Sequence, residues 1–405
     1  MSRQIRLFSV TNDLREGGDG HRLLYFSKTI DRERFWHRVV TLKRGDARMT
    51  LHAGDLAPLF VDAGVDVVSL DEGYPNAEVR SKAMHLMNST GVLARSTRKL
   101  IRRIRQDRVD VLDAHGGAAC LVSTLASAVA GTQLVVTDYG TTLPPMMFWP
   151  ILGRFVFSRA NAVISDSEAK GEEMSKWILR RRRYVHIIPN GITPPTSTRS
   201  RREMLAYFGL PDEREGRVVG QISGLNPHKG HAVLLRAIPK ILQSEPKTAF
   251  LIVGYAKHEH SEYKRQLEQT AEALGISDRV KICSYPYWIG DVWKVIDIQA
   301  HPALSDSLPN AIIEGMSLGK PAVVTNVGGI PTMVEHEISG LVVPPHDENA
   351  LARALLRIIQ DQALARRLGD AAYARFTARY TAEITTRQLE NLFAELALKS
   401  GVRTA

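Results

Sequence analysis

The chain has 405 residues, of which 44% are hydrophobic and 24% are charged, a balance typical of globular domains rather than of disordered or coiled-coil chains. Lysine and arginine exceed aspartate and glutamate by 53 − 43 = 10, which favours anionic partners: phosphorylated small molecules, acidic membrane surfaces or nucleic acid. Its two cysteines, Cys120 and Cys283, exclude a disulfide framework and favour a reducing cytosol, and neither a targeting signal nor a membrane-spanning stretch is expected.

Short strand-like runs alternate with longer helical patterns from the start of the chain. In the first half, the runs that we predict to be strands are residues 5–10, 38–42, 65–70, 109–115, 133–138 and 160–166. Residues 82–108 lie between two of them and have the spacing of an amphipathic helix. The alternation restarts after residue 216, with predicted strands at residues 217–223, 248–254, 279–285, 297–303, 321–326 and 340–345.

This alternation predicts an α/β protein, because strand–helix repeats form parallel sheets that helices cover on both faces. We expect two doubly wound domains, over residues 1–193 and 206–379, joined by a Pro- and Ser-rich linker over residues 194–205. Ligands of open parallel sheets bind beyond the carboxyl ends of the strands. We therefore look for functional residues directly after strands, in a cleft that the two domains face.

The most informative segment covers residues 301–331. Pro309 suits the first turn of a helix, where its missing N–H costs nothing. The amides of residues 310–312 would then be unpaired donors at a helix start, which favours an anion such as a phosphate. Asp306 precedes these amides and Glu314 follows them, which suits a sugar nucleotide with hydroxyls on both sides of its diphosphate. The alternative is a surface helix with two solvated acids.

This segment resembles the donor-binding signature of the family 4 retaining glycosyltransferases, which have the GT-B fold of two Rossmann-like domains facing a central cleft. Their pattern is an acidic residue, seven residues and Glu, then a small-residue turn and Pro; here it runs from Asp306 through SLPNAII to Glu314 and GMSLGKP. The resemblance implies that Glu314 holds the ribose hydroxyls and that Asp306 contacts the transferred sugar. The donor-binding amides would be those of Asn310, Ala311 and Ile312. The first acid is Asp here where Glu is commoner, so its reach is shorter.

A second match is the string QISGLNPHKG, which resembles the family's strand–loop–helix segment ending in Lys-Gly. In the family, a Lys and an Arg flank the donor diphosphate. Lys229 falls on the Lys position, where a point charge can bind phosphate. Gly224 stands where the Arg is expected, which puts the affinity for the diphosphate in question. Arg22 and His228 are candidate substitutes, and a solvated lysine is the alternative to phosphate contact.

In the N-terminal domain, three further positions lie at predicted strand exits. Gly17 and Gly18 resemble the family's Gly-Gly loop facing the donor, since glycine lets the backbone approach a ligand closely. His115 ends a strand before two glycines and matches a family histidine that faces the transferred sugar, with a packed imidazole as the alternative. Asp138 ends the next strand, where we expect residues on the acceptor side.

Two other segments match less specific features of the family. The string HIIPNGI resembles the signature that closes the first domain, and its Asn190 and Gly191 most simply form a turn. Near Cys283 and Tyr285, the family holds the donor's base with backbone groups, although aromatic core packing explains this region equally well. The GT-B resemblance also implies that the final helix, about residues 380–405, packs back on the N-terminal domain.

Two arginine-rich segments, residues 95–108 and 177–184, interleave cations with apolar residues. This pattern suits an anionic bilayer surface or an anionic lipid-linked acceptor, with a solvated helix face as the alternative. No motif typical of RNA or DNA binding accompanies the charge, so no nucleic-acid partner is expected. We therefore expect a cytoplasmic protein, and a peripheral position on the inner face of the membrane is the alternative.

Together these features predict a retaining glycosyltransferase that uses a UDP- or GDP-linked sugar and a hydroxyl acceptor, such as a glycan or lipid-linked precursor. No metal or other cofactor is expected, because no Asp-x-Asp pattern or His/Cys cluster indicates a bound cation. Lys229 would stabilise the leaving diphosphate, and by resemblance His115 and Asp306 orient the sugar in a front-face substitution. Two other classes stay open: a GT-B hydrolase or epimerase of sugar nucleotides, and a non-catalytic subunit, which Gly224 favours.

Overall fold

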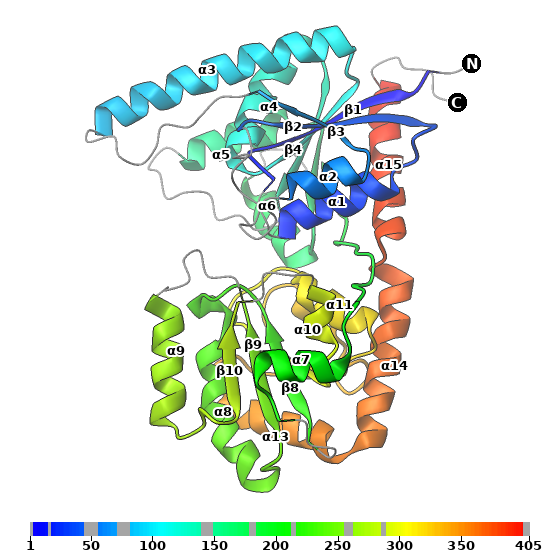
Figure 1. Ribbon diagram of the computed structural model, residues 1–405. Helices are drawn as coiled ribbons and strands as arrows, with labels where there is room; N and C mark the ends of the chain where they lie inside the picture. The colour runs from blue at the N-terminus through cyan, green and yellow to red at the C-terminus, as the bar shows by residue number, and fades with distance from the viewer. Residues whose placement is uncertain are drawn as a thin grey trace. The chain divides into compact units, whose positions relative to one another are not determined.

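The computed structural model describes residues 3–14, 18–43, 56–70, 82–138, 149–177, 184–211, 216–254, 262–284 and 289–399 (Figure 1). The chain divides into two compact units. Unit 1 comprises Met1–Gly191 with Ala382–Ala405, and unit 2 comprises Ile192–Thr381. Each unit contains one parallel β-sheet, which confirms the predicted α/β fold with two doubly wound sheets.

The sheet of unit 1 has seven strands in the order β3-β2-β1-β4-β5-β6-β7. These strands are β1 (Ile5–Thr11), β2 (Phe35–Thr41), β3 (Asp66–Ser69), β4 (Val111–His115), β5 (Gln133–Asp138), β6 (Ala162–Ser165) and β7 (Val185–Ile187). The first six coincide with predicted runs. β7 was not predicted, because a three-residue edge strand with partly exposed side chains has too little periodicity to stand out.

Helices cover the two faces of this sheet with separate hydrophobic clusters. They are α1 (Gly18–Thr29), α2 (Ala57–Asp62), α3 (Lys82–Asp107), α4 (Gly117–Ala130), α5 (Trp149–Arg159), α6 (Glu168–Trp177) and α15 (Ala382–Lys399). Leu7 and Phe8 are neighbours in β1 and belong to different clusters, as the alternation of side chains along a strand requires. Phe393 of α15 packs edge to face on Phe26 of α1, with ring centroids 5.9 Å apart, so the C-terminal helix is part of this core.

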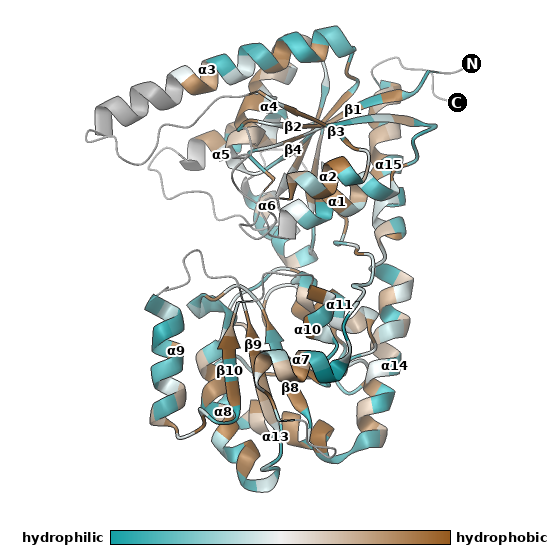
Figure 2. Ribbon diagram, in the orientation of Figure 1, coloured by the Kyte–Doolittle hydropathy of each residue, from teal (hydrophilic) through white to brown (hydrophobic). Residues whose placement is uncertain are grey.

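The sheet of unit 2 has six strands in the order β10-β9-β8-β11-β12-β13. They are β8 (Val218–Ile222), β9 (Ala249–Val253), β10 (Val280–Cys283), β11 (Ile298–His301), β12 (Ala322–Thr325) and β13 (Leu341–Val343). All six coincide with predicted runs. The central strands β8, β9 and β11 are buried on both faces, as parallel strands between helices must be. β9 is hydrophobic along its length (Figure 2), whereas β8 and β11 also contain the buried polar residues Gln221, Gln299 and His301.

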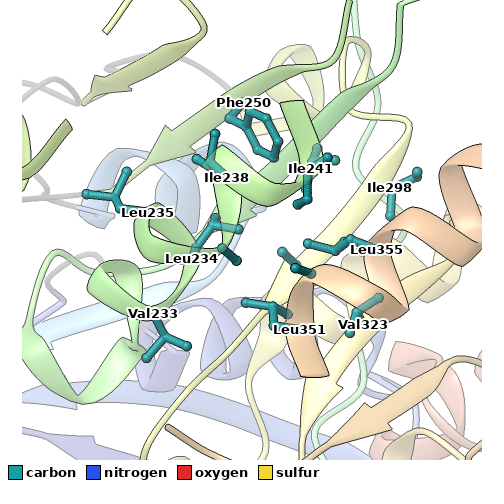
Figure 3. Packing of buried hydrophobic residues seen from close by; sticks show 14 of the residues in the cluster. Val233, Leu234, Leu235, Ile238, Ile241, Phe250, Ile298, Val323, Leu351 and Leu355 are labelled. Carbon is teal, nitrogen blue, oxygen red and sulfur yellow. The ribbon is translucent and has the colours of Figure 1, made fainter. Parts of the chain in front are cut away.

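The helices of unit 2 are α7 (Arg201–Phe208), α8 (His231–Ser244), α9 (Glu262–Ala273), α10 (Ile289–Trp293), α11 (Asn310–Ser317), α12 (Ile330–Met333), α13 (Glu348–Gln360) and α14 (Gln362–Arg379), with a 3₁₀ turn, η3 (Pro227–Lys229). Figure 3 shows side chains of α8 and α13 packed together against the sheet. Helix α7 begins inside the segment expected to be a linker. Ser200 and Glu203 form a capping box there, which stabilises a helix start that composition alone did not reveal.

Both sheets reverse their strand order once, which creates a switch point in each. In unit 1 the reversal lies between β1 and β4, and in unit 2 between β8 and β11. Loops leave such a pair of strands in opposite directions, so a ligand can enter beyond their carboxyl ends. The predicted functional residues gather beyond the carboxyl ends of these two strand pairs.

Candidate functional site

Two loops pack tightly together at the switch point of unit 2. One follows β8 and contains η3, and the other follows β11 and leads to α11. The amide of Leu304 donates a 2.7 Å hydrogen bond to the carbonyl oxygen of His228. Gly230 has φ of +70°, and a Cβ atom there would lie 1.8 Å from the carbonyl oxygen of Pro302. Only glycine fits this position, because the two loop backbones touch.

Three polar side chains converge beyond these strands. Lys229 Nζ lies 2.5 Å from Asp306 Oδ2, and His301 Nε2 lies 3.1 Å from the same oxygen. The second carboxylate oxygen, Oδ1, accepts a 3.1 Å hydrogen bond from the amide of Ser307. His301 is the last residue of β11 and is 1% exposed, whereas the Lys229 and Asp306 side chains are 23% and 13% exposed. The structure thus joins two sequence-predicted residues, and adds a histidine behind them.

The neighbours of Asp306 keep its carboxyl group ionised. Burial by itself raises the pKa, but the hydrogen bonds and charges of His301 and Lys229 outweigh it and lower the pKa to about 2. An ionised carboxylate only accepts hydrogen bonds, so it can hold the hydroxyl groups of a sugar. The alternative of a solvated acid is therefore wrong for Asp306.

The start of α11 differs from the prediction in two details. Pro309 is not in the first turn of the helix but is its N-cap, with extended backbone angles of φ −68° and ψ 122°. Its carbonyl oxygen accepts a 3.0 Å hydrogen bond from the amide of Ile312. The prediction that the Ile312 amide is unpaired is therefore wrong, because the helix closes a tight first turn on the proline. Asn310 and Ala311 open the helix at the predicted place.

Glu314 lies one turn into α11 and is held by a tryptophan that the sequence did not single out. The indole Nε1 of Trp293, at the end of α10, donates a 2.9 Å hydrogen bond to Glu314 Oε2. Trp293 is 1% exposed and Glu314 is half-buried. A Cβ atom at Gly315 would lie 2.3 Å from Gln299 Oε1, so glycine there lets α11 lie close to β11. Glu314 is therefore oriented rather than freely solvated.

The position expected to carry an arginine is an exposed glycine in the loop after β8. A Cβ atom at Gly224 would have an ordinary contact, 3.7 Å from Asn226 Nδ2. Of the two candidate substitutes, His228 is exposed in η3. Arg22 is 3% exposed inside unit 1, where its Nη1 donates a 2.7 Å hydrogen bond to Asn190 Oδ1.

The switch point of unit 1 holds a second histidine–aspartate pair. His115 ends β4, and its Nε2 lies 2.8 Å from Asp113 Oδ2. Thr137 of β5 donates a 2.8 Å hydrogen bond from its hydroxyl to Asp113 Oδ1. Burial raises the pKa of Asp113, but the contacts with His115 and Thr137 outweigh it, and the pKa is lowered. The carboxylate therefore stays ionised although it is 2% exposed.

The remaining predicted residues lie at the expected strand exits or outside the described residues. Gly17 and Tyr285 are outside the described residues, Gly18 is the first residue of α1, and Asp138 is the last residue of β5. Cys283 ends β10, and its carbonyl oxygen accepts a 3.0 Å hydrogen bond from the amide of Gly254. Burial raises the pKa of the Cys283 thiol to about 11, so this cysteine is not an activated nucleophile.

Sequence reasoning missed Asp113, His301 and Trp293. Asp113 stands two residues before His115 in one strand, a spacing that places both side chains on the same face and was available as a signal. His301 is five residues before Asp306, with no periodic pattern to link them. Trp293 and Glu314 belong to different helices, so only the folded chain brings them together.

The described residues contain no group of three or more His, Cys, Asp and Glu side chains that could hold a metal ion. Among the same residues, no helix combines the length and apolarity needed to cross a bilayer.

Comparisons with known proteins indicate the family to which the chain is similar. Two family models match the chain: Glycosyl transferases group 1 over residues 209–375, and Glycosyltransferase Family 4 over residues 49–194. A D-inositol 3-phosphate glycosyltransferase of Corynebacterium jeikeium is 30% identical over 224 residues, which are 52% of this chain and 52% of that relative. An alpha-D-kanosaminyltransferase of Streptomyces kanamyceticus is 25% identical over 74% of this chain and 80% of its own length. The match thus spans about half the length of the first relative.

Solved structures share the fold at lower identity. A glycosyltransferase from Rickettsia africae superposes with a TM-score of 0.79 at 16% identity, covering 97% of this chain and 99% of the other. Anabaena Alr3699/HepE in complex with UDP-glucose superposes with a TM-score of 0.77 at 22% identity, covering 97% and 100%. At these identities the likeness concerns the arrangement of the elements.

Proposed function

The chain belongs to glycosyltransferase family 4 and has the GT-B fold, and from this premise we propose that it transfers a sugar from a UDP- or GDP-linked donor to a hydroxyl acceptor with retention of configuration. The observation that carries the proposal is the contact between Lys229 and Asp306 at the switch point of unit 2. A cation suited to phosphate and an acid suited to sugar hydroxyls are adjacent there, as a sugar nucleotide requires.

In this proposal each donor group has a partner in unit 2. Glu314, oriented by Trp293, accepts hydrogen bonds from the ribose hydroxyls. The diphosphate lies at the start of α11, near Asn310 and Ala311, where the helix dipole favours an anion. Lys229 adds a positive charge, and the nucleotide base lies near Cys283, by resemblance to the family.

The proposed reaction is a front-face substitution. The bond between the anomeric carbon and the phosphate oxygen breaks, and the leaving diphosphate keeps the electron pair. The acceptor oxygen bonds to the same face of the anomeric carbon, and its proton passes to the departing phosphate oxygen. Lys229 stabilises the charge that develops on the diphosphate. Asp306 and His115 orient the sugar, and Asp138 is proposed for the acceptor side.

A second candidate is a non-catalytic or weakly active subunit that keeps the fold. Gly224 favours this alternative, because it removes the arginine that the family places beside the diphosphate. Losing one electrostatic donor typically costs about 3 to 4 kcal/mol of transition-state stabilisation. Binding of UDP or GDP without turnover would support this candidate, and release of free sugar without acceptor product would indicate a hydrolase.

The acceptor is proposed to be anionic or lipid-linked, because α3 presents a cationic face. Its exposed cations include Arg95, Arg98, Lys99, Arg102, Arg103 and Arg105. Of the apolar residues on this stretch, Leu100 and Ile104 are buried in the core of unit 1, and Ile101 is partly buried against it. Contact with a membrane at the cytoplasmic face would therefore be electrostatic rather than inserted.

Vesicle sedimentation tests the cationic face of α3. Binding should require anionic lipid and fade with salt, because screening weakens exposed charges. Exchanging Arg102 and Arg103 for Glu should reduce the bound fraction, whereas Arg366→Glu with Arg367→Glu in unit 2 serves as the charge-matched control. Equal binding of neutral and anionic vesicles contradicts the proposal.

The transferase proposal is tested by a turnover screen. The purified chain is incubated with UDP- and GDP-linked sugars and candidate acceptors, and released UDP or GDP and the glycosylated product are detected by mass spectrometry. Product from one donor class with retained anomeric configuration, determined by NMR, supports the proposal. Failure of every donor to bind in calorimetry contradicts it.

A further inference from the structure

His301 contacts the sugar-binding carboxylate from behind, although nothing in the sequence marked it as functional. It ends β11, is 1% exposed, and has its Nε2 atom 3.1 Å from Asp306 Oδ2. We propose that His301 is a positioning residue, which keeps the Asp306 carboxylate aimed at the donor sugar when Lys229 turns to the diphosphate. This inference rests on the proposed function and deepens it.

The loop backbone around Asp306 is fixed on both sides. Gly328 has φ of +52°, and a Cβ atom there would lie 1.8 Å from the carbonyl oxygen of Asp306. The amide of Leu304, two residues earlier, is bonded to the carbonyl oxygen of His228. With the backbone held, the direction of the carboxylate depends on the groups that contact its oxygens.

Two of those groups share one oxygen. Lys229 and His301 both contact Asp306 Oδ2, whereas Oδ1 accepts from the backbone amide of Ser307. Lys229 has a long side chain that is 23% exposed, and His301 is enclosed. Lysine can therefore move to a phosphate, and the buried ring cannot.

Because position 224 is not an arginine, the separate roles of Lys229 and His301 become more important. Lys229 is the cation proposed for the diphosphate, and it also forms an ion pair with Asp306. A diphosphate carries more negative charge than one carboxylate and competes for the ammonium group. Once Lys229 moves, the hydrogen bond from His301 is the side-chain contact that still orients Asp306.

The ring nitrogen that faces Asp306 must carry a proton for this role. At neutral pH the Asp306 carboxylate is ionised, because its pKa is held at about 2, and an ionised carboxylate has no proton to donate. His301 Nε2 is therefore the donor. His231 of α8 interacts electrostatically with His301. Burial and the neighbouring His301 lower the pKa of His231 to about 4, so His231 is neutral and adds no competing charge.

The test measures how much the sugar adds to nucleotide affinity. Calorimetry compares UDP with UDP-glucose and GDP with GDP-mannose, for wild type and His301→Leu. Because His301→Leu removes a hydrogen bond to a charged group, the affinity for UDP-glucose or GDP-mannose should fall roughly tenfold. The affinity for free UDP or GDP should stay unchanged. His301→Gln keeps an amide N–H near the Nε2 position and should recover most of the loss.

A second buried histidine provides the matched control. His231 is fully buried, and its Nε2 lies 3.0 Å from Ser223 Oγ rather than at the carboxylate. His231→Leu should leave the ratio of sugar-nucleotide to nucleotide affinity unchanged. An equal loss of UDP and UDP-glucose binding in His301→Leu, or no loss at all, overturns the inference.

A measurement without ligand separates this inference from the proposed function. In ¹⁵N-histidine NMR spectra of the free protein, the His301 Nε2–H signal should persist and should shift in Asp306→Asn. An unprotonated Nε2 overturns the inference whatever the protein binds. If the wild type binds none of the four nucleotides, the proposed function is contradicted instead. The NMR result then still decides the role of His301.

Discussion

Both units hold a histidine–aspartate pair at the switch point of a parallel sheet, but the two pairs are arranged in opposite order. In unit 1, Asp113 lies within β4 and is 2% exposed, and His115 ends the strand. In unit 2, the fully buried residue is His301 at the end of β11, and Asp306 lies on the following loop with part of its surface accessible. The carboxylate is thus a buried support in one unit and a partly accessible group in the other.

The difference shows how burial assigns a role to a carboxylate. Asp113 has both oxygens engaged by protein side chains, those of His115 and Thr137, so it orients its neighbours. Asp306 has one oxygen in contact with Lys229, which is 23% exposed and which we propose that a diphosphate can displace. A buried charge must be fully paired, whereas a charge at the rim can exchange partners. The same two residue types therefore form an enclosed pair in unit 1 and a partly accessible pair in unit 2, where we propose that Asp306 faces a ligand.

Removing the buried carboxylate of unit 1 should have the largest effect. Asp113→Ala leaves the side chains of His115 and Thr137 without their acceptor, so we expect the free energy of unfolding to fall by about 3 to 5 kcal/mol. Denaturant titration measures this change. Asp66→Ala removes a half-exposed acid of the same sheet and should cost at most about 1 kcal/mol. Equal costs would contradict the supporting role of Asp113.

The effect of Asp113→Ala on stability should depend on pH in one direction. The pKa of Asp113 is lower in the folded chain than its ordinary value of 3.8, so its stabilisation is fully present above that value. It is lost as the pH falls through the folded pKa. The stability difference between wild type and Asp113→Ala should therefore narrow below about pH 3.8 and stay constant near neutrality.

Removing the exchangeable cation of unit 2 should affect turnover more than stability. Lys229→Ala is expected to reduce kcat/KM by tenfold or more, about 1.4 kcal/mol, because the diphosphate loses its positive partner. Steady-state release of UDP or GDP measures it. Lys294→Ala changes an exposed lysine of the same unit and serves as the control. Activity within twofold of wild type in Lys229→Ala would remove this lysine from the site.

The tryptophan behind Glu314 should have an intermediate effect. Trp293→Phe keeps an aromatic ring in the core but removes the N–H donor, so we expect UDP or GDP affinity to fall by roughly fivefold. Glu314→Ala should weaken nucleotide binding further. Calorimetry compares these variants with Trp36→Phe, which changes a half-buried ring in unit 1. If Trp293→Phe binds UDP or GDP with unchanged affinity, the hydrogen bond from Trp293 is not needed to orient Glu314.

Adding charge at the rim should have the smallest effect and the opposite sign. The loop at Gly224 has ordinary contacts for a side chain, so Gly224→Arg should fold and raise donor affinity by roughly threefold through a second cation near the phosphates. Gly224→Gln controls for side-chain size. If both variants bind equally, or if arginine weakens binding, the idea that Lys229 alone neutralises the diphosphate fails.

The sequence by itself determined the strand series of both units and the acids of the 306–314 signature. Strands that are buried on both faces have hydrophobic runs that can be recognised locally, and a motif within nine consecutive residues keeps its spacing whatever the fold. Lys229 was also found from its local Lys-Gly string. The three-residue strand β7 was missed because it is too short to show a periodic pattern, and the N-cap position of Pro309 was misplaced because local backbone angles decide it.

Only the tertiary structure decided how these residues act on one another. Lys229 and Asp306 are 77 residues apart, and Trp293 and Glu314 are 21 apart. Such pairs meet because β8 and β11 are neighbours in the sheet and because the helices pack on the sheet in a fixed arrangement. The contacts made in the folded chain then keep Asp113 and Asp306 ionised despite their burial. Pairing across the sheet and loss of water are properties of the folded chain, which residue spacing does not encode.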